Sequence, residues 1–233
     1  MRKQSEMKNV VKTKNDKRKI VIIGDSHIRN CAAELQQQLG RKCSVSGYVK
    51  SGAGMDVIVH SMKEEIGKLN GEDVVVVWGG ANDIGKKNSQ EALRHLYKFV
   101  DKSQNVNVIV MSAPHRHDLM PSSCVNHEVV RFNRQLKKRM KLCKNVKILE
   151  TDLNRDCFTK HGLHMNSYGK AQIILNLAEM TESLSVKNDV SYIQLQWKEN
   201  EINLDNGSTE RILGIEGGTS FTVNRYQKMM EEG

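Results

Sequence analysis

The sequence lacks the features that direct a protein into or across a membrane. No apolar stretch approaches the length of a membrane-spanning helix. The first 19 residues are positively charged but contain no apolar core of the kind found in a secretory signal peptide. The five cysteines are scattered without a C-x-x-C pair, which is more typical of reduced thiols than of a disulfide framework. We therefore expect a soluble intracellular protein, located in the cytoplasm.

Internal repeats and low-complexity blocks are also missing from the sequence, which excludes a solenoid or an array. The 233 residues are enough for one sizeable core. We expect a basic, disordered arm over residues 1–18 and one folded domain over residues 19–185. Residues 186–233 have isolated apolar clusters without a sustained period, and this predicts a weakly ordered C-terminal extension.

The net charge of +9 is unevenly distributed along the chain. Residues 1–19 carry +6 and residues 186–233 carry −3, which leaves +6 for the segment between them. A basic arm attracts nucleic acid or an anionic membrane surface, although a solvated end without a partner explains the charge as well, and we favour that simpler explanation. A second basic region, Arg131–Lys147, predicts weak attraction to phosphate but no sequence-specific readout.

Five runs rich in β-branched residues alternate with segments that have apolar residues at helical spacing. The predicted strands are residues 19–24, 43–49, 73–78, 106–112 and 145–150. The predicted helices are residues 28–39, 55–69, 90–103, 126–143 and about 166–184. Strands without polar alternation are typical of parallel sheets that helices cover on both faces. The pattern predicts an α/β fold, a three-layer α/β/α sandwich around a doubly wound, parallel five-stranded sheet.

Polar residues and glycines follow several of the predicted strands. Ser26 follows the first strand in "VIIGDSH", at the entry to the predicted helix 28–39. Gly52 and Gly54 follow the second strand in "KSGAGMD", and Asn82 follows the third strand in "VVWGGAND". His161 and His164 precede the last predicted helix. Because parallel strands all point the same way, these residues are expected at one edge of the sheet. Taken singly, each has a structural explanation as a turn or a helix cap.

Together, these residue types are the parts of a nucleophilic catalytic site. A serine supplies the nucleophile, backbone N–H groups and an asparagine amide stabilise an oxyanion, and a histidine acts as general base. The pairs His161/His164 and His115/His117 also raise the question of a metal. Neither pair has the cysteine or carboxylate company expected of a zinc site, so we expect no metal and no cofactor.

The stretches "IIGDSH", "SGAGMD", "VVWGGAND" and "HGLHMNSYGK" resemble, in this order, the motifs of the SGNH hydrolases, also called GDSL-like esterases. The resemblance covers about residues 19–184. It implies Ser26 as nucleophile and as one oxyanion donor through its N–H group. It further implies Asn82 as an oxyanion donor, Gly54 or alternatively Gly52 as the glycine donor, and His164 as general base.

One position departs from the family pattern. Family members usually have aspartate three residues before the base, where this sequence has His161. The acid fixes the tautomer of the imidazole, and its loss lowers the rate of a serine protease by about 10⁴. Three explanations remain open: Asp156 or Asp152 supplies the carboxylate, a backbone carbonyl orients a Ser–His dyad, or the site is impaired. His161 itself stays a candidate third member.

A narrower resemblance links "GDSHIRN" and "FTKHGLHMNSYGK" to esterase domains of LINE-type retrotransposons and of transposon-derived proteins. Two functions follow. The first is a serine esterase that hydrolyses an acetyl or other short acyl ester, with a small ester or acylated molecule as substrate. The alternative is a catalytically impaired module of the same fold that binds nucleic acid or an anionic membrane through residues 1–19 and Arg131–Lys147.

Overall fold

The computed structural model describes residues 17–184. Nearly all of the predicted basic arm and the whole of the predicted C-terminal extension lie outside the described residues. The described part contains one five-stranded parallel sheet in the order β2-β1-β3-β4-β5. Its strands are β1 (Arg18–Gly24), β2 (Cys43–Val49), β3 (Val74–Trp78), β4 (Asn107–Met111) and β5 (Val146–Leu149). The predicted doubly wound sheet is therefore confirmed.

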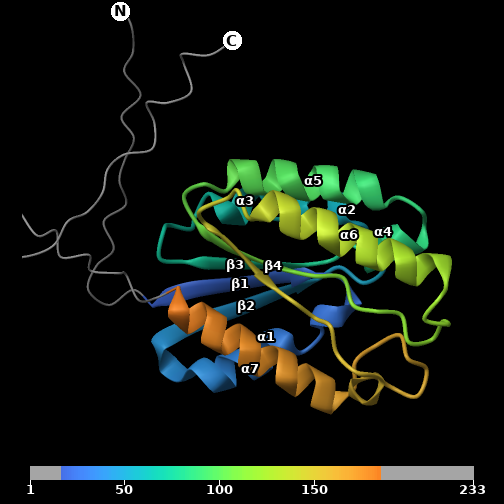
Figure 1. The fold of residues 1–233 in the computed structure, drawn as a ribbon. Helices are drawn as coiled ribbons and strands as arrows, with labels where there is room; N and C mark the ends of the chain where they lie inside the picture. Colours follow the sequence, from blue (N-terminus) through green and yellow to red (C-terminus); the bar gives the residue numbers. More distant parts are fainter. Residues whose placement is uncertain (1–16, 185–233) are drawn as a thin grey trace, which may run out of the picture. The chain divides into compact units, whose positions relative to one another are not determined.

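Helices cover both faces of the sheet, as Figure 1 shows. One face is covered by α1 (Cys31–Leu39) and α7 (Ser167–Ser183). The opposite face is covered by α2 (Met55–His60), α5 (Ser89–Lys102) and α6 (Cys124–Met140). The short elements are the helices α3 (Lys63–Ile66) and α4 (Ala81–Gly85) and the 3₁₀ turns η1 (Ser26–Ile28), η2 (Gly40–Lys42) and η3 (Arg155–Cys157). Each face of the sheet forms its own apolar core, as the three-layer prediction requires.

The expectation that every strand is buried on both faces holds only for the centre of the sheet. All five residues of β3 are buried, as are the last five of β1 and the last four of β4. Strand β2 lies at the edge of the sheet, and its residues are half-buried or exposed. Strand β2 pairs on one side only, so that half of its surroundings is water.

Two of the predicted helices are interrupted. The predicted helix 28–39 is divided into η1 and α1, because Asn30 has a left-handed backbone with φ of 69°. Asparagine tolerates this conformation better than most residues do. The predicted helix 55–69 is divided into α2 and α3 at Ser61 and Met62. Both interruptions are only two residues long, and apolar periodicity continues across them.

Within residues 17–184, no helix is both long and apolar enough to cross a lipid bilayer. All five cysteines lie in this part of the chain and none forms a disulfide. Cys31 and Cys157 are buried, and burial raises the pKa of the Cys31 thiol to about 11. That thiol is therefore protonated at neutral pH and is a poor nucleophile.

Candidate active site

Ser26 lies beyond the carboxyl end of β1, the strand that pairs with β2 on one side and with the central strand β3 on the other. The backbone N–H of Asp25 donates to the carbonyl of Trp78 at 3.1 Å, which extends the sheet by one residue before η1 begins. Ser26 is the first residue of η1 and is half-buried. It does not begin α1, as the sequence suggested, because Asn30 stands between η1 and that helix.

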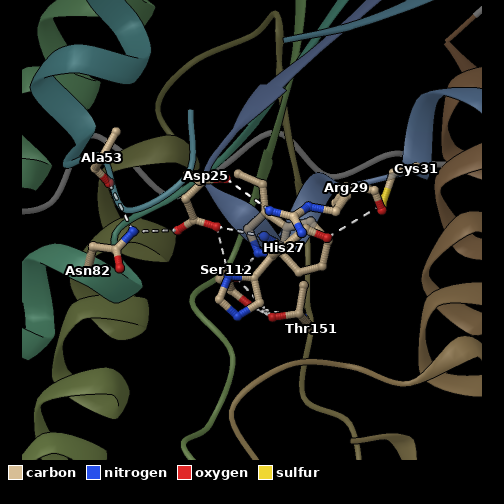
Figure 2. A network of polar contacts seen from close by, with 10 residues as sticks. Asp25, His27, Arg29, Cys31, Ala53, Asn82, Ser112 and Thr151 are labelled. Atoms are coloured by element: carbon tan, nitrogen blue, oxygen red, sulfur yellow. Dashed lines mark hydrogen bonds and ion pairs between the residues drawn. The ribbon is translucent and has the colours of Figure 1, made fainter. Parts of the chain in front are cut away.

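The side chain of Asp25 connects the segments that surround Ser26. It is fully buried, and its Oδ1 accepts hydrogen bonds from Nδ1 of His27 at 2.7 Å and from the backbone N–H of His27 at 3.0 Å. Its Oδ2 lies 3.5 Å from Nδ2 of Asn82. Figure 2 shows the carboxylate of Asp25 between these two side chains. The contacts fix both Asn82 and His27 relative to the backbone of Ser26.

Asn82 lies on α4 and joins the loop after β3 to the loop after β2. Its Nδ2 donates to the carbonyl of Ala53 at 3.0 Å, as Figure 2 also shows. The next residue, Asp83, is buried and accepts the backbone N–H of Met55 at 3.0 Å through Oδ2. Burial raises the pKa of Asp83, and the hydrogen bond from Met55 opposes that rise. Two consecutive side chains of α4 thus hold the peptide units on either side of Gly54.

Gly54 has no room for a side chain. A Cβ atom at this position would lie 2.7 Å from Oδ1 of Asp83 and 2.9 Å from Oδ1 of Asp56. Its backbone N–H has no acceptor within residues 17–184. Gly52 is different, because it is exposed in a turn with φ of +72° and open space around its Cα. Glycine is needed for close packing at residue 54 and for backbone conformation at residue 52.

His164 is carried by a loop that the backbone holds in place between η3 and α7. The N–H of Thr159 donates to the carbonyl of His164 at 2.8 Å, and Phe158 and Met165 form an isolated antiparallel bridge. The carbonyl of Gly162 accepts the N–H of His117 from the loop after β4 at 3.1 Å. This arrangement requires glycine at 162, where φ is +75° and a Cβ would lie 2.5 Å from the backbone of His117.

The imidazole of His164 lies beside that of His27, with ring centroids 5.4 Å apart and planes inclined by 55°. Partial loss of water around the ring lowers the pKa of His164 from its usual value, and the neighbouring imidazole of His27 adds to this effect. The carboxylate of Asp25 acts in the opposite direction. No hydrogen bond joins His164 to Ser26 in the described structure.

Three residues were candidates to complete a catalytic triad with Ser26 and His164, and all three have exposed side chains. His161 lies in the same loop as His164, Asp156 lies in η3, and Asp152 lines a groove beside α6. Among the described residues, no hydrogen bond or ion pair connects any of them to His164. The carboxylate that raises the pKa of His164 is that of Asp25.

The histidine pairs do not gather metal ligands. The rings of His115 and His117 are 5.7 Å apart, and the ring of His117 also packs against Phe158 at 4.4 Å. Over residues 17–184, no group of three or more His, Cys, Asp and Glu side chains is arranged to hold a metal ion.

Sequence reasoning missed the buried pair Asp25–His27. The motif "VIIGDSH" contains both residues, but only Ser26 was assigned a role from the sequence. The available signal was the position of an aspartate at the end of a strand that is buried on both sides, where a carboxylate needs hydrogen-bond donors. It also missed Asp83, the side chain that fills the space beside Gly54.

Comparison with solved structures identifies the architecture. A member of the lipolytic G-D-S-L family from Veillonella parvula is similar with a TM-score of 0.60 at 17% identity, over 69% of this chain and 96% of that protein. The aryl esterase of M. smegmatis is similar with a TM-score of 0.56 at 17% identity, over 72% and 99%. Est24, a carbohydrate acetylesterase from Sinorhizobium meliloti, has a TM-score of 0.55 at 14% identity, over 72% and 100%.

No protein-family model matches the sequence, and no curated protein matches it either. The identities to the solved structures are low, so that the likeness concerns the fold. It agrees with the five-stranded parallel sheet and with the helices that cover both of its faces. The chain has the fold of the SGNH, or GDSL-type, hydrolases.

Proposed function

We propose that the protein is a serine esterase that hydrolyses a small carboxylic ester, with an acetyl or other short acyl group. The observation that carries this proposal is the pair of contacts around Asp25. Through them, the segment of Ser26 is tied to Asn82 on one side and to His27, the neighbour of His164, on the other. These contacts support a site in which the candidate nucleophile works together with a candidate oxyanion donor and a candidate base.

In the proposed reaction, Oγ of Ser26 attacks the ester carbonyl and His164 accepts the serine proton. The carbonyl oxygen becomes an oxyanion, which the N–H groups of Ser26 and Gly54 and the amide of Asn82 stabilise. His164 then returns the proton to the leaving alcohol. Water attacks the acyl-enzyme in the second half of the reaction, with His164 again as base, and this releases the acid and Ser26.

The amide of Asn82 has to change partners for this reaction. Nδ2 of Asn82 lies 3.0 Å from the carbonyl oxygen of Ala53 and 3.5 Å from Oδ2 of Asp25, so that both of its hydrogens have an acceptor. The second contact is at the limit of hydrogen-bonding distance. We expect this hydrogen to turn to the oxyanion when substrate binds, while the contact with Ala53 is kept.

Hydrolysis of p-nitrophenyl acetate tests this function. The parent protein is compared with Ser26→Ala and His164→Ala, and with His60→Ala, which removes an exposed histidine on α2, as the matched control. We expect turnover in the parent and the control and background rates in the two site variants. Equal rates in all four folded proteins exclude a Ser–His site acting on this ester, and a wider set of acyl esters then completes the test.

A second candidate function is a catalytically impaired module that binds anionic partners. The observation that favours it is a basic groove beside α6. Its volume is about 760 Å³, and its cationic lining residues are Arg134, Lys137, Lys138 and Lys141. The charge is partly neutralised, because Lys137 pairs with Glu150 at 2.7 Å. Arg131 and Arg139, on the same helix, pair with Glu128 and Asp101.

Binding to an oligonucleotide and to anionic vesicles at several salt concentrations tests this second function. Steep salt dependence that Ser26→Ala leaves unchanged supports a binding module, and so does its loss in a variant with Arg134, Lys138 and Lys141 changed to glutamine. Negligible, salt-insensitive binding removes it.

A further inference from the structure

His27 carries a buried nitrogen without a partner. Its side chain is 6% exposed, and its Nδ1 is engaged by Oδ1 of Asp25 at 2.7 Å. The other ring nitrogen, Nε2, is buried and has no hydrogen-bond partner among the described residues. Buried polar atoms are nearly always satisfied, so an exception next to a candidate catalytic group requires an explanation.

The contact with Asp25 determines what this nitrogen can do. A carboxylate only accepts hydrogen bonds, so Nδ1 of His27 carries the proton that is donated to Oδ1. In the neutral imidazole, Nε2 is then a lone-pair acceptor. The backbone N–H of His27 donates to the same oxygen at 3.0 Å, which fixes the ring relative to Asp25. The unpartnered nitrogen therefore needs a donor.

The polar groups around Trp78, whose ring packs beside that of His27, have partners of their own. The indole ring of Trp78 lies 5.7 Å from the ring of His27, but its Nε1 donates to the carbonyl of Ser112 at 3.2 Å. The hydroxyl of Thr151 also donates to this carbonyl, at 2.9 Å, and the hydroxyl of Ser112 lies 3.2 Å from that of Thr151. These polar groups, drawn together in Figure 2, satisfy one another.

The imidazole of His164 is the second ring that packs beside His27. Its ring centroid is 5.4 Å from that of His27. An imidazole nitrogen lies about 1.2 Å from its ring centroid, so two nitrogens that face each other across this separation lie about 3 Å apart, a normal hydrogen-bond length. The exposed side chain of His164 is free to turn into this arrangement, whereas His27 is held by Asp25.

We propose that His27 is a positioning residue for His164: Nε2 of His27 accepts a hydrogen bond from a ring N–H of His164, with Asp25 behind it. This inference rests on the proposed esterase function. The contact fixes the tautomer of His164, so that its other nitrogen faces Oγ of Ser26. The buried pair thus performs the orienting task that an aspartate at position 161 performs in the family pattern.

The proton balance of the reaction is unchanged. During attack, the proton of Ser26 moves to His164, which becomes an imidazolium and keeps its hydrogen bond to His27. No proton passes to His27, which remains neutral and bonded to Asp25. The imidazolium is stabilised by a hydrogen bond to a neutral acceptor and, beyond it, by the negative charge of Asp25.

Two substitutions of His27 distinguish its effect on the orientation of His164 from its effect on the folding of the protein. His27→Gln can place a carbonyl acceptor near the former Nε2 and lacks a titratable ring. His27→Asn keeps an N–H donor near the former Nδ1, toward Asp25, but places no acceptor toward His164. Both variants are assayed with p-nitrophenyl acetate beside the parent and Ser26→Ala. The tautomer of neutral His164 is measured in each protein by ¹⁵N NMR, which needs no substrate.

We expect kcat of His27→Asn to fall at least about tenfold with little change in KM, a small part of the loss of about 10⁴ that follows removal of a triad aspartate. His27→Gln is expected to stay near the parent value. One tautomer of His164 should dominate in the parent and in His27→Gln, and both should be present in His27→Asn. The parent measurement is decisive by itself if His27→Asn does not fold.

Several results would overturn the proposal. A mixture of His164 tautomers in the parent, or an unchanged kcat in folded His27→Asn, removes the positioning role alone. Loss of activity in both folded variants to the level of His164→Ala shows that an acceptor at the former Nε2 is not what His27 contributes, and this also overturns the positioning role. Absence of Ser26-dependent hydrolysis in the parent overturns the esterase function and this inference together, and is distinguished from the other outcomes by the parent rate.

Discussion

Nδ2 of Asn82 donates to the carbonyl oxygen of Ala53 at 3.0 Å, which fastens the loop after β3 to the loop after β2. The same amide reaches Oδ2 of Asp25 at 3.5 Å, at the end of β1. One side chain therefore touches the ends of two other strands. A change at Asn82 is expected to affect both the chemistry and the packing of the site.

Replacing Asn82 by alanine should lower kcat by about 10²–10³ if the amide is an oxyanion donor. The lost hydrogen bond should also lower the free energy of unfolding by about 1 kcal/mol. The matched control is Asn133→Ala, because Asn133 donates to the carbonyl of Ala113 at 2.9 Å without touching Asp25. Turnover and urea unfolding are measured for both variants. Equal turnover in Asn82→Ala and the parent contradicts the oxyanion role.

Gly54→Ala should impair the site more than Gly52→Ala. A methyl group at residue 54 displaces the carboxylate of Asp83, which costs about 1–3 kcal/mol and shifts the neighbouring N–H groups. At residue 52 the space is open, and the left-handed backbone adds a strain of about 1 kcal/mol. Esterase rates and unfolding midpoints of the two variants check this order. The reverse order of turnover would favour Gly52 as the oxyanion glycine.

The pH dependence of kcat/KM should report the state of His164. A general base acts in its neutral form, so the rate should rise with pH and level off, with a midpoint below the usual histidine pKa because the pKa of His164 is lowered. Arg29 is among the groups that lower this pKa, and Arg29→Gln should therefore move the midpoint upward. The profiles are recorded from about pH 5 to 8 at constant ionic strength. A midpoint that Arg29→Gln moves downward argues against this assignment.

Asn126 should be important for stability although it lies outside the site. It is fully buried, and it exchanges hydrogen bonds of 2.9 and 3.0 Å with the backbone of Arg116 and donates to the carbonyl of Met120 at 3.0 Å. Asn126→Ala leaves these backbone groups unsatisfied, at a cost of about 1–3 kcal/mol for each one that water cannot reach. The control is Val130→Ala, on the exposed side of α6, the helix that also carries Asn126. We expect this variant to change the free energy of unfolding by no more than about 0.5 kcal/mol. Urea unfolding that does not distinguish the two variants contradicts this account.

The sheet and its flanking helices could be predicted from the sequence because their signals are repeated along each element. All five strands were located to within one or two residues, since a run such as "DVVVVW" fits a buried strand at every position. The interruption at Asn30 could not be predicted, because it depends on the backbone angles of a single residue. The edge position of β2 depends on the order of the strands, which the sequence does not state.

The candidate site was predictable to the level of loops but not of contacts. The positions of Ser26, Gly54 and Asn82 at one sheet edge follow from the parallel arrangement of the strands. The pairing of Asp25 with His27 depends on side-chain rotamers within one 3₁₀ turn. The same holds for Asp83, whose carboxylate fills the space beside Gly54.

Position 161 is the point at which this chain departs from the family pattern, and its surroundings have a consequence for evolution. His161 is exposed and has no hydrogen bond or ion pair in the part of the chain that the structure describes, while the shape of its loop is maintained by the backbone of Gly162 and His164. Folding therefore exerts little selection on the residue at 161. Aspartate and histidine are therefore interchangeable there at almost no cost in stability, so that a change at this position is free to follow the needs of the reaction.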